Sequence, residues 1–348
     1  MSYTTSEILK MKEPGELFSD NIKTIKDEYV ELAKIYHPDR NKNSQQANEV
    51  MAKISEFYTK CLEMINSGIY IKPDLIKLKS KDGKLYEVKY RISHSFELGT
   101  IYVGNTVVLY LIDNEYKNLF ENLSGIEKRF TFADEKMKVE FERYLPNVIG
   151  KFETLDSKFG VVVKKTPDMV TLADVLNYYD GQMPVRHVAW IISSLMNLVC
   201  YINYTGVSHN SISLDTYFIS PKLHSGSLLG GWWYSVPLGD KMIGVTEKTY
   251  SIMPPQVKSK KVGDILTDLE SIRLIGRELL GDRNGTRLLE SNDVPSTMAK
   301  WLRSVASDKP LKEYSKWSEV LYQSFGRRKF VKMKFNEEEL YLKIKTKK

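Results

Sequence analysis

The sequence predicts an α+β protein, with an N-terminal all-α helical hairpin followed by a larger two-lobed domain. Three observations predict this fold class. Apolar residues recur at three- and four-residue spacing up to residue 65, alternate in strand-like runs between residues 68 and 118, and return to helical spacing after Thr171. Strands followed by helices indicate an α+β domain in which the two kinds of element are segregated.

Two amphipathic helices are predicted at the N-terminus. The first runs from Ser19 to Tyr36 and ends before Pro38, because a proline disfavours the helical conformation in the residue before it. The second follows a polar loop at residues 41–46. The expected core residues are Ile22, Ile25, Tyr29, Leu32, Ala33 and Tyr36 on the first helix and Ala47, Met51, Ile54, Tyr58, Leu62 and Ile65 on the second. The pair should pack as an antiparallel hairpin, covered by Leu9, Leu17 and Phe18.

The loop between these helices contains the tripeptide His37-Pro38-Asp39. Taken alone, it could be a chance turn, and a histidine and an aspartate without a nucleophile form no hydrolytic site. Between two helices with this core spacing, residues 5–67 resemble a J-domain, the module of DnaJ-type co-chaperones. The resemblance implies that His37, Pro38 and Asp39 bind a DnaK-type chaperone and stimulate its ATP hydrolysis. The candidate docking charges are Lys23, Lys26, Lys34 and Arg40.

The remainder of the chain has strands at "KLYEVKYRI", "GTIYVG", "TVVLYLI" and "FGVVV", with a charged helix at residues 134–144 before the last of them. Helices follow at "TLADVLNYY" and "PVRHVAWIISSLMNLVCYINYTG". Together with "SHNSISLDTYFIS", "MPPQV" and "DILTDLESIRLIG", this order resembles the protein-kinase fold over about residues 80–325. The resemblance allows each active position of a kinase to be compared with this chain.

Nearly every active position has lost the side chain that phosphotransfer needs. In the glycine-rich loop His94 and Phe96 occupy the first two glycine places and only Gly99 remains, while Tyr110 stands where a lysine should hold the phosphates. In the catalytic loop His209 is kept, Ser211 replaces the base, and Thr216 replaces the metal-binding asparagine. Gly230 stands in the place of the second metal-binding acid. Asp268 resembles the buried aspartate that supports the catalytic loop.

These replacements predict a pseudokinase, with no catalytic residues, no bound metal and no cofactor. We therefore expect a co-chaperone whose J-domain recruits a DnaK-type chaperone and whose residues 70–348 bind a specific client protein. The alternative is an atypical ATP-dependent protein kinase, with Asp215 and Asp240 as displaced metal ligands, whose J-domain recruits a chaperone. Trp232 and Trp233 are expected in a packed core, or alternatively on a surface that anchors a partner.

Composition limits the other function classes. Cys61 and Cys200 form neither a disulfide framework nor a zinc motif, and polar residues interrupt the apolar stretch at residues 191–202, which predicts a cytoplasmic protein without a membrane span. The net charge of +7 is uneven: residues 1–69 carry 9 basic and 11 acidic side chains. No binding motif for nucleic acid accompanies the basic remainder.

The expected domains are a J-domain at 1–69, a β-rich lobe with its hinge at 70–170, a helical lobe at 171–330 and a basic tail at 331–348. In the tail, apolar and basic residues alternate, which predicts two short strands or an extended arm packed on the helical lobe, with a frayed terminus as the alternative. The alternating residues are Phe330, Lys332, Lys334, Phe335, Leu340, Leu342, Lys343, Ile344 and Lys345.

Overall fold

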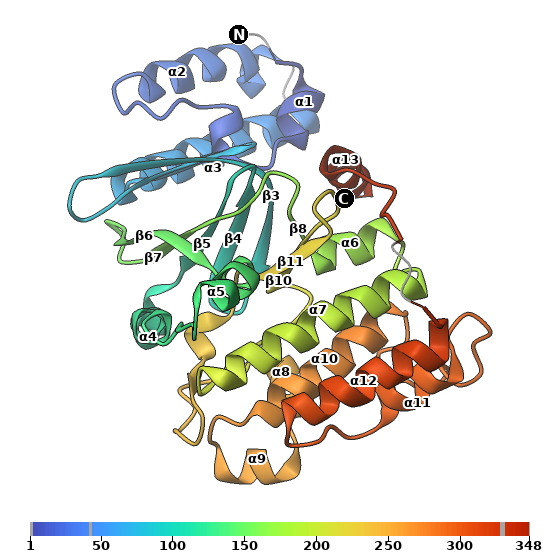
Figure 1. Cartoon of the computed structure of the whole chain (residues 1–348). Helices are drawn as coiled ribbons and strands as arrows, with labels where there is room; N and C mark the ends of the chain where they lie inside the picture. The colour runs from blue at the N-terminus through green and yellow to red at the C-terminus, as the bar shows by residue number, and fades with distance from the viewer. Residues whose placement is uncertain (1–2, 42–43, 328–330, 348) are drawn as a thin grey trace. The chain divides into compact units, whose positions relative to one another are not determined.

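The computed structural model describes residues 3–41, 44–327 and 331–347 (Figure 1). The chain divides into two compact units. The first unit contains residues 1–115 and 149–162, and the second contains residues 116–148 and 163–348. Phe330 lies outside the described residues. The boundaries expected at residues 69, 170 and 330 stay predictions.

The first unit begins with helices. Their bounds are α1 (Thr5–Lys10), η1 (Pro14–Glu16), α2 (Ile25–Tyr36), η2 (Pro38–Arg40) and α3 (Gln45–Ser67). As predicted, α2 and α3 pack against each other, and Leu17 and Phe18 are buried against them. The first helix is shorter than expected, because the Asn21 side chain accepts the Lys23 N–H and forms a separate turn. Ile22 therefore lies outside the core and is 52% exposed.

The buried face of α3 is offset from the predicted one. Its fully buried residues are Ala47, Val50, Ile54, Phe57 and Cys61, whereas Met51, Tyr58, Leu62 and Ile65 are only partly buried beside them. Tyr58 stacks on Tyr29 of α2 at 4.4 Å between ring centroids. The apolar residues of α3 cover a broad stripe, and the periodicity alone did not show where the centre of that stripe lies.

A seven-stranded sheet with the order β1-β2-β3-β4-β5-β7-β6 follows the helices. Its strands are β1 (Ile69–Lys72), β2 (Leu75–Lys79), β3 (Leu85–Phe96), β4 (Gly99–Gly104), β5 (Val107–Ile112), β6 (Asn147–Glu153) and β7 (Phe159–Lys164). The quoted strand segments are confirmed in β3, β4, β5 and β7, whereas the β1–β2 hairpin and β6 were not distinguished in the sequence. The "VVV" segment is a buried part of β7.

The second unit is mainly helical. Its helices are α4 (Lys117–Glu127), α5 (Glu135–Phe141), η4 (Glu142–Tyr144), α6 (Leu172–Tyr178), α7 (Val185–Tyr204), η5 (Trp232–Tyr234), α8 (Glu247–Ile252), α9 (Pro255–Lys260), α10 (Ile265–Leu279), α11 (Ser296–Arg303), α12 (Pro310–Phe325) and α13 (Glu337–Lys347), and η3 (Asn114–Tyr116) leads into it. Its short strands are β8 (Val170–Thr171), β9 (Val207–Ser208), β10 (Tyr217–Ser220), β11 (Ser225–Leu228) and β12 (Val236–Pro237). The predicted helices at α5, α6 and α7 are confirmed, and α4 was missed.

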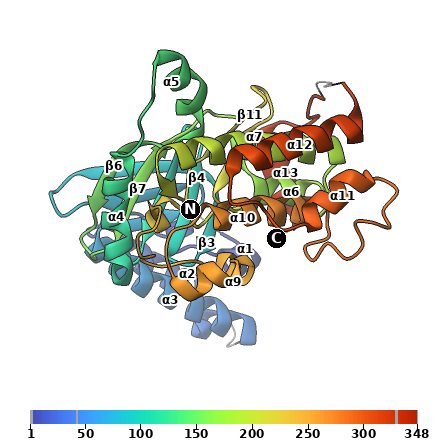
Figure 2. The same ribbon diagram turned by 60° about the horizontal axis from the view of Figure 1, so that its bottom comes forward.

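Helix α7 forms the centre of the second unit and contacts both α10 and α12 (Figure 2). It is long and apolar enough to cross a membrane by length and composition, yet 67% of its most apolar window is buried inside the fold. A core helix has these properties too, so no membrane span is evident from α7.

The prediction of two strands or an extended arm is wrong for residues 337–347, which form helix α13, whereas residues 331–336 form no regular element and bury Met333 and Phe335. The Asn336 side chain accepts the Glu339 N–H at 2.8 Å and caps this helix. The expected packing on the helical part of the chain is correct. Leu340, Tyr341 and Ile344 are buried, and α13 lies against α6.

Candidate functional site

The His-Pro-Asp loop begins where α2 ends. The His37 N–H donates to the Ala33 carbonyl at 2.9 Å, and Pro38 then starts the short helix η2. The Asp39 N–H donates to His37 Nδ1 at 3.3 Å, and an Asp39 carboxylate oxygen lies 3.6 Å from the same nitrogen. The side chains of His37 and Asp39 are 50% and 76% exposed. The loop therefore presents both polar side chains to solvent in a defined backbone conformation.

Two side chains that follow Asp39 hold this loop to the end of α2. The Asn41 amide donates to the carbonyls of Ile35 and His37 at 2.9 and 3.0 Å. Arg40 Nη1 donates to the Lys34 carbonyl at 3.1 Å, so the guanidinium, expected only as a docking charge, also has a local role. These bonds satisfy carbonyl groups that the helix end would otherwise leave open. Asn41 was not among the residues expected to matter in this loop, although asparagine is a common residue in such turns.

The other predicted docking charges are exposed. Lys23 lies in the turn before α2, and Lys26 and Lys34 lie on α2 itself. By helical spacing these two lysines project away from the buried residues Ile25 and Leu32. They share the exposed side of α2 with the acidic Asp27 and Glu31, so this side of the helix carries both signs of charge.

Bulky side chains occupy the strand positions that we expect at the nucleotide site of a kinase-like fold. In the β3–β4–β5 register, His94 pairs with Ile101, and Ile101 pairs with Tyr110, so these side chains share one face of the sheet. Phe96 packs edge-on against the buried Tyr110 at 6.0 Å between ring centroids. Aromatic rings thus stand at positions where the sequence comparison expected glycine and lysine.

Gly99 has a structural reason to be glycine. A Cβ atom on Gly99 would lie 2.1 Å from the Leu111 carbonyl oxygen in the neighbouring strand. The residue therefore allows close pairing of β4 and β5. Close strand pairing is therefore a sufficient reason for glycine at position 99, and no bound phosphate is needed to explain it.

In the second unit, Asp268 lies buried beneath the loop that begins at His209. Its carboxylate oxygens accept the N–H groups of His209 and Asn210 at 2.7 and 2.8 Å. The His209 ring packs edge-on against Trp232, and burial lowers the pKa of His209 to about 3. The neutral imidazole accepts the Ser211 N–H at 3.2 Å. Asp268 thus holds the loop through its backbone N–H groups, and His209 holds it through an uncharged ring.

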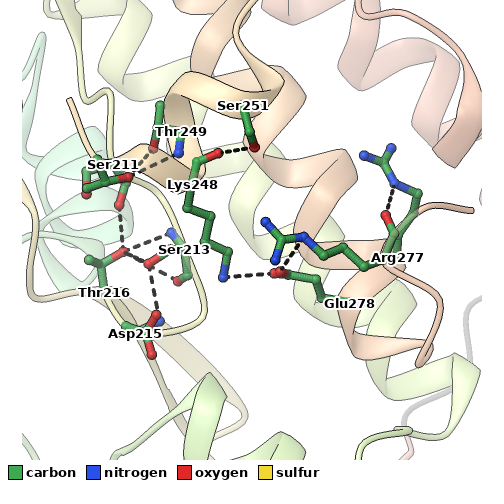
Figure 3. A network of polar contacts seen from close by, with 11 residues as sticks. Ser211, Ser213, Asp215, Thr216, Lys248, Thr249, Ser251, Arg277 and Glu278 are labelled. Atoms are coloured by element: carbon green, nitrogen blue, oxygen red, sulfur yellow. Dashed lines mark hydrogen bonds and ion pairs between the residues drawn. The ribbon is translucent and has the colours of Figure 1, made fainter. Parts of the chain in front are cut away.

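The remaining polar groups of this loop bond to one another (Figure 3). The Thr216 hydroxyl donates to the Ser211 carbonyl at 2.9 Å and accepts the Ser213 N–H at 2.9 Å. The Ser213 hydroxyl in turn accepts the Asp215 N–H at 3.2 Å. Ser211, at the place of the catalytic base, is a buried neutral side chain. The hydroxyl groups close the loop on itself without any charged side chain.

The segment at the place of the second metal-binding acid is also neutral and tightly packed. Gly230 is followed by Gly231, where a Cβ atom would lie 2.8 Å from the His209 ring and where the backbone has a positive φ of 82°. Trp232 and Trp233 are both buried, and the indole N–H of Trp232 donates to the Leu228 carbonyl at 2.7 Å. The prediction of a packed core for these tryptophans is confirmed, and the alternative of an exposed anchor is wrong.

Asp215 and Asp240, the displaced ligands of the alternative reading, are both exposed. Among the residues that the structure describes, no three His, Cys, Asp or Glu side chains come together in a way that could hold a metal ion. The described residues therefore contain no preformed cluster for Mg²⁺ around these two acids.

Comparisons with known proteins match two parts of the chain. Residues 16–61 match the family model of the DnaJ domain. The N-terminal segment is a J-domain. A solved structure of vaccinia related kinase 3 aligns with a TM-score of 0.50 and 13% identity, over 75% of this chain and 94% of that one. No curated protein matches the sequence. The J-domain is thus followed by a protein-kinase-like fold, and a J-domain implies co-chaperone activity toward a DnaK-type ATPase.

Proposed function

We propose that this protein is a J-domain co-chaperone whose kinase-like domain binds a specific client protein and does not transfer phosphate. The observation that carries the proposal is a contrast within one chain. The His37-Pro38-Asp39 loop is intact and exposed, whereas the kinase-like positions hold neutral or aromatic side chains. We assign chaperone binding to this loop and to the exposed basic side chains of Lys23, Lys26, Lys34 and Arg40.

Phosphoryl transfer depends almost entirely on positioning and on charge stabilisation. Tyr110, Ser211, Thr216 and Gly230 supply no charge, and a buried phenol cannot replace an ammonium group beside a triphosphate. Loss of these charges favours a binding module over an enzyme. We therefore propose no catalytic residue, metal or cofactor for this chain.

The alternative is an atypical ATP-dependent kinase whose J-domain recruits a chaperone to its own fold. The retained Asp268 support favours it, because the loop that would carry catalytic groups is still ordered by two hydrogen bonds. This alternative requires Asp215 or Asp240 to hold Mg²⁺, and both lie exposed on separate loops.

The proposed location is the cytoplasm, where a DnaK-type partner and its ATP are available. Both cysteines are unpaired, and burial raises the pKa of Cys61 and of Cys200 to about 11. Neither thiol is therefore a reactive nucleophile at neutral pH. We propose neither nucleic acid nor a membrane surface as a partner.

His37→Gln tests the co-chaperone activity. The exchange removes the imidazole from an exposed loop and leaves the α2–α3 core intact, so the helical content should not change. Steady-state ATP hydrolysis by a DnaK-type chaperone should rise with the wild-type chain and stay at its basal rate with the variant.

His94→Gln provides the matched control, because it makes the same exchange in strand β3 and should keep the stimulation. If the wild-type chain stimulates no DnaK-type chaperone, or if His37→Gln stimulates as well as the wild type, the co-chaperone assignment is wrong.

A further inference from the structure

A groove in the second unit lies outside all the kinase-like positions described above. It is bordered by the first half of α7, by the end of α12 and by the turn between β10 and β11. Its volume is about 290 Å³, and its lining includes Arg186, Trp190, His224, Leu321, Phe325 and Arg327. Neither the J-domain activity nor the retained loop scaffold uses these residues.

The floor of this groove is apolar. Trp190 stacks on His224 at 4.0 Å between ring centroids, and Leu321 and Phe325 extend the surface from α12. The lining also contains the hydroxyl of Ser193. It already donates to the Ala189 carbonyl at 2.8 Å and accepts the indole N–H of Trp317 at 2.9 Å. A ligand in the groove would therefore meet apolar surface without displacing an internal hydrogen bond.

The charge of the groove comes from two arginines. The Arg186 guanidinium lies 4.9 Å from the centre of the Phe325 ring, and such stacking leaves its in-plane N–H groups free to donate. Arg327 is exposed just beyond the same end of α12, two residues after Phe325. Within the described ranges, no carboxylate pairs with either arginine, and no lining residue is acidic. Burial lowers the pKa of His224, so this ring stays neutral and adds no charge.

The size of the groove limits its occupant. Pockets for drug-sized ligands and cofactors span roughly 300–1,000 Å³, so this one suits one or two side chains better than a whole nucleotide. Arginine pairs beside an apolar surface recognise carboxylates by charge-assisted hydrogen bonds.

We propose that this groove docks an acidic peptide segment of the client, with an apolar side chain on Trp190 and Leu321 and carboxylates on Arg186 and Arg327. The inference rests on the proposed function, since it names the part of the kinase-like domain that holds the client. It commits to a peptide in which acidic and apolar residues alternate.

The test uses the full chain and three fluorescein-labelled peptides of equal length. One alternates leucine and glutamate, one alternates leucine and lysine, and one alternates glycine and glutamate. Fluorescence anisotropy should show saturable binding of the leucine-glutamate peptide alone, and added salt should weaken that binding because the contacts are ionic. Equal binding of the leucine-lysine peptide, or no binding of the leucine-glutamate peptide, would overturn the proposal.

Charge reversal then locates the site. Arg186→Glu combined with Arg327→Glu should weaken binding by about tenfold or more, the effect of losing charge-assisted hydrogen bonds. Arg129→Glu combined with Arg303→Glu reverses the same number of charges outside the groove and should bind normally. If the groove variant binds like the wild type, the site lies elsewhere. The milder variant Arg186→Gln with Arg327→Gln guards against misfolding as the cause. It should have the same melting temperature as the wild type and still bind the peptide weakly.

Stimulation of the DnaK-type ATPase is measured on the same samples. Because His37 lies in the first unit and the groove in the second, the groove variants should stimulate fully. If the groove variants lose peptide binding but stimulate the ATPase fully, the groove proposal is supported. If the wild-type chain itself does not stimulate the ATPase, the co-chaperone function is contradicted instead.

Discussion

At the scale of single residues, buried polar groups organise the loop that begins at His209. Asp268 shows this clearly, since its carboxylate bonds to two backbone N–H groups in a fully buried position. The tripeptide at His37 could be identified from the sequence because its three residues are consecutive. The role of Asn41 could not, because its partner carbonyls at Ile35 and His37 come within reach only after α2 has ended.

Asp268 should make stability depend on pH. Burial raises its pKa from 3.8 to about 7. An acid that binds its proton more tightly in the folded state stabilises the fold below its unfolded pKa and loses that contribution as pH rises through its folded pKa. The contribution of protonated Asp268 should therefore be complete below pH 3.8 and decline up to about pH 7.

Asp268→Asn removes this titration and keeps the size of the side chain. It offers one oxygen to two N–H donors, so it should be less stable than the wild type throughout. Urea unfolding between pH 4 and 8 should show the gap between the two proteins narrowing as pH rises. A gap that is constant or widens with pH would contradict the raised pKa, and the exposed Asp240→Asn serves as the control.

At the scale of elements, helix α13 has a sequence pattern that predicted the wrong secondary structure. Alternation of apolar and basic residues favoured strands, yet Asn336 followed by three glutamates is a helix start, with a capping side chain and acids in the first turn. Leu340, Tyr341 and Ile344 also have the spacing of one helical face. Short segments carry both periodicities, and the contact with α6 decides between them.

A pair of leucines in α13 tests this packing. Leu340 is fully buried, whereas Leu342 is 67% exposed on the same helix. Leu340→Ala should lower the free energy of unfolding by about 2–5 kcal/mol, because it removes buried methyl groups and leaves a cavity. Leu342→Ala should change it by less than about 0.5 kcal/mol. Equal effects in thermal unfolding would mean that α13 is not docked as described.

At the scale of the whole molecule, the J-domain and the sheet share one compact unit. Helix α3 ends at Ser67 and is capped by Gly68 in a left-handed conformation, and β1 starts at the next residue, Ile69. Tyr70 of β1 belongs to the same buried cluster as the J-domain helices, and its hydroxyl donates to the Phe18 carbonyl at 2.7 Å. Lys77 of β2 forms an ion pair with Asp20.

These contacts join the J-domain to the sheet without a flexible linker. The sequence could predict the J-domain and the kinase-like order from local motifs and periodicity. It could not predict this junction, because the contacts of Tyr70 and Lys77 join residues more than 50 positions apart. The hairpin of β1 and β2 was missed for the same reason, since Ile69, Ile76 and Leu78 are buried against strand residues that come later in the chain.

The central claim is that the kinase-like fold serves binding and not phosphotransfer, and nucleotide binding tests it most directly. Unfolding of the full chain is followed with ATP alone and with ATP and Mg²⁺. A ligand at a hundred times its dissociation constant adds about 2.7 kcal/mol to the free energy of unfolding. The account predicts no metal-dependent stabilisation, since no lysine or metal-binding acid occupies the kinase-like positions. A clear increase in stability that requires both ATP and Mg²⁺ would contradict it and favour the atypical kinase.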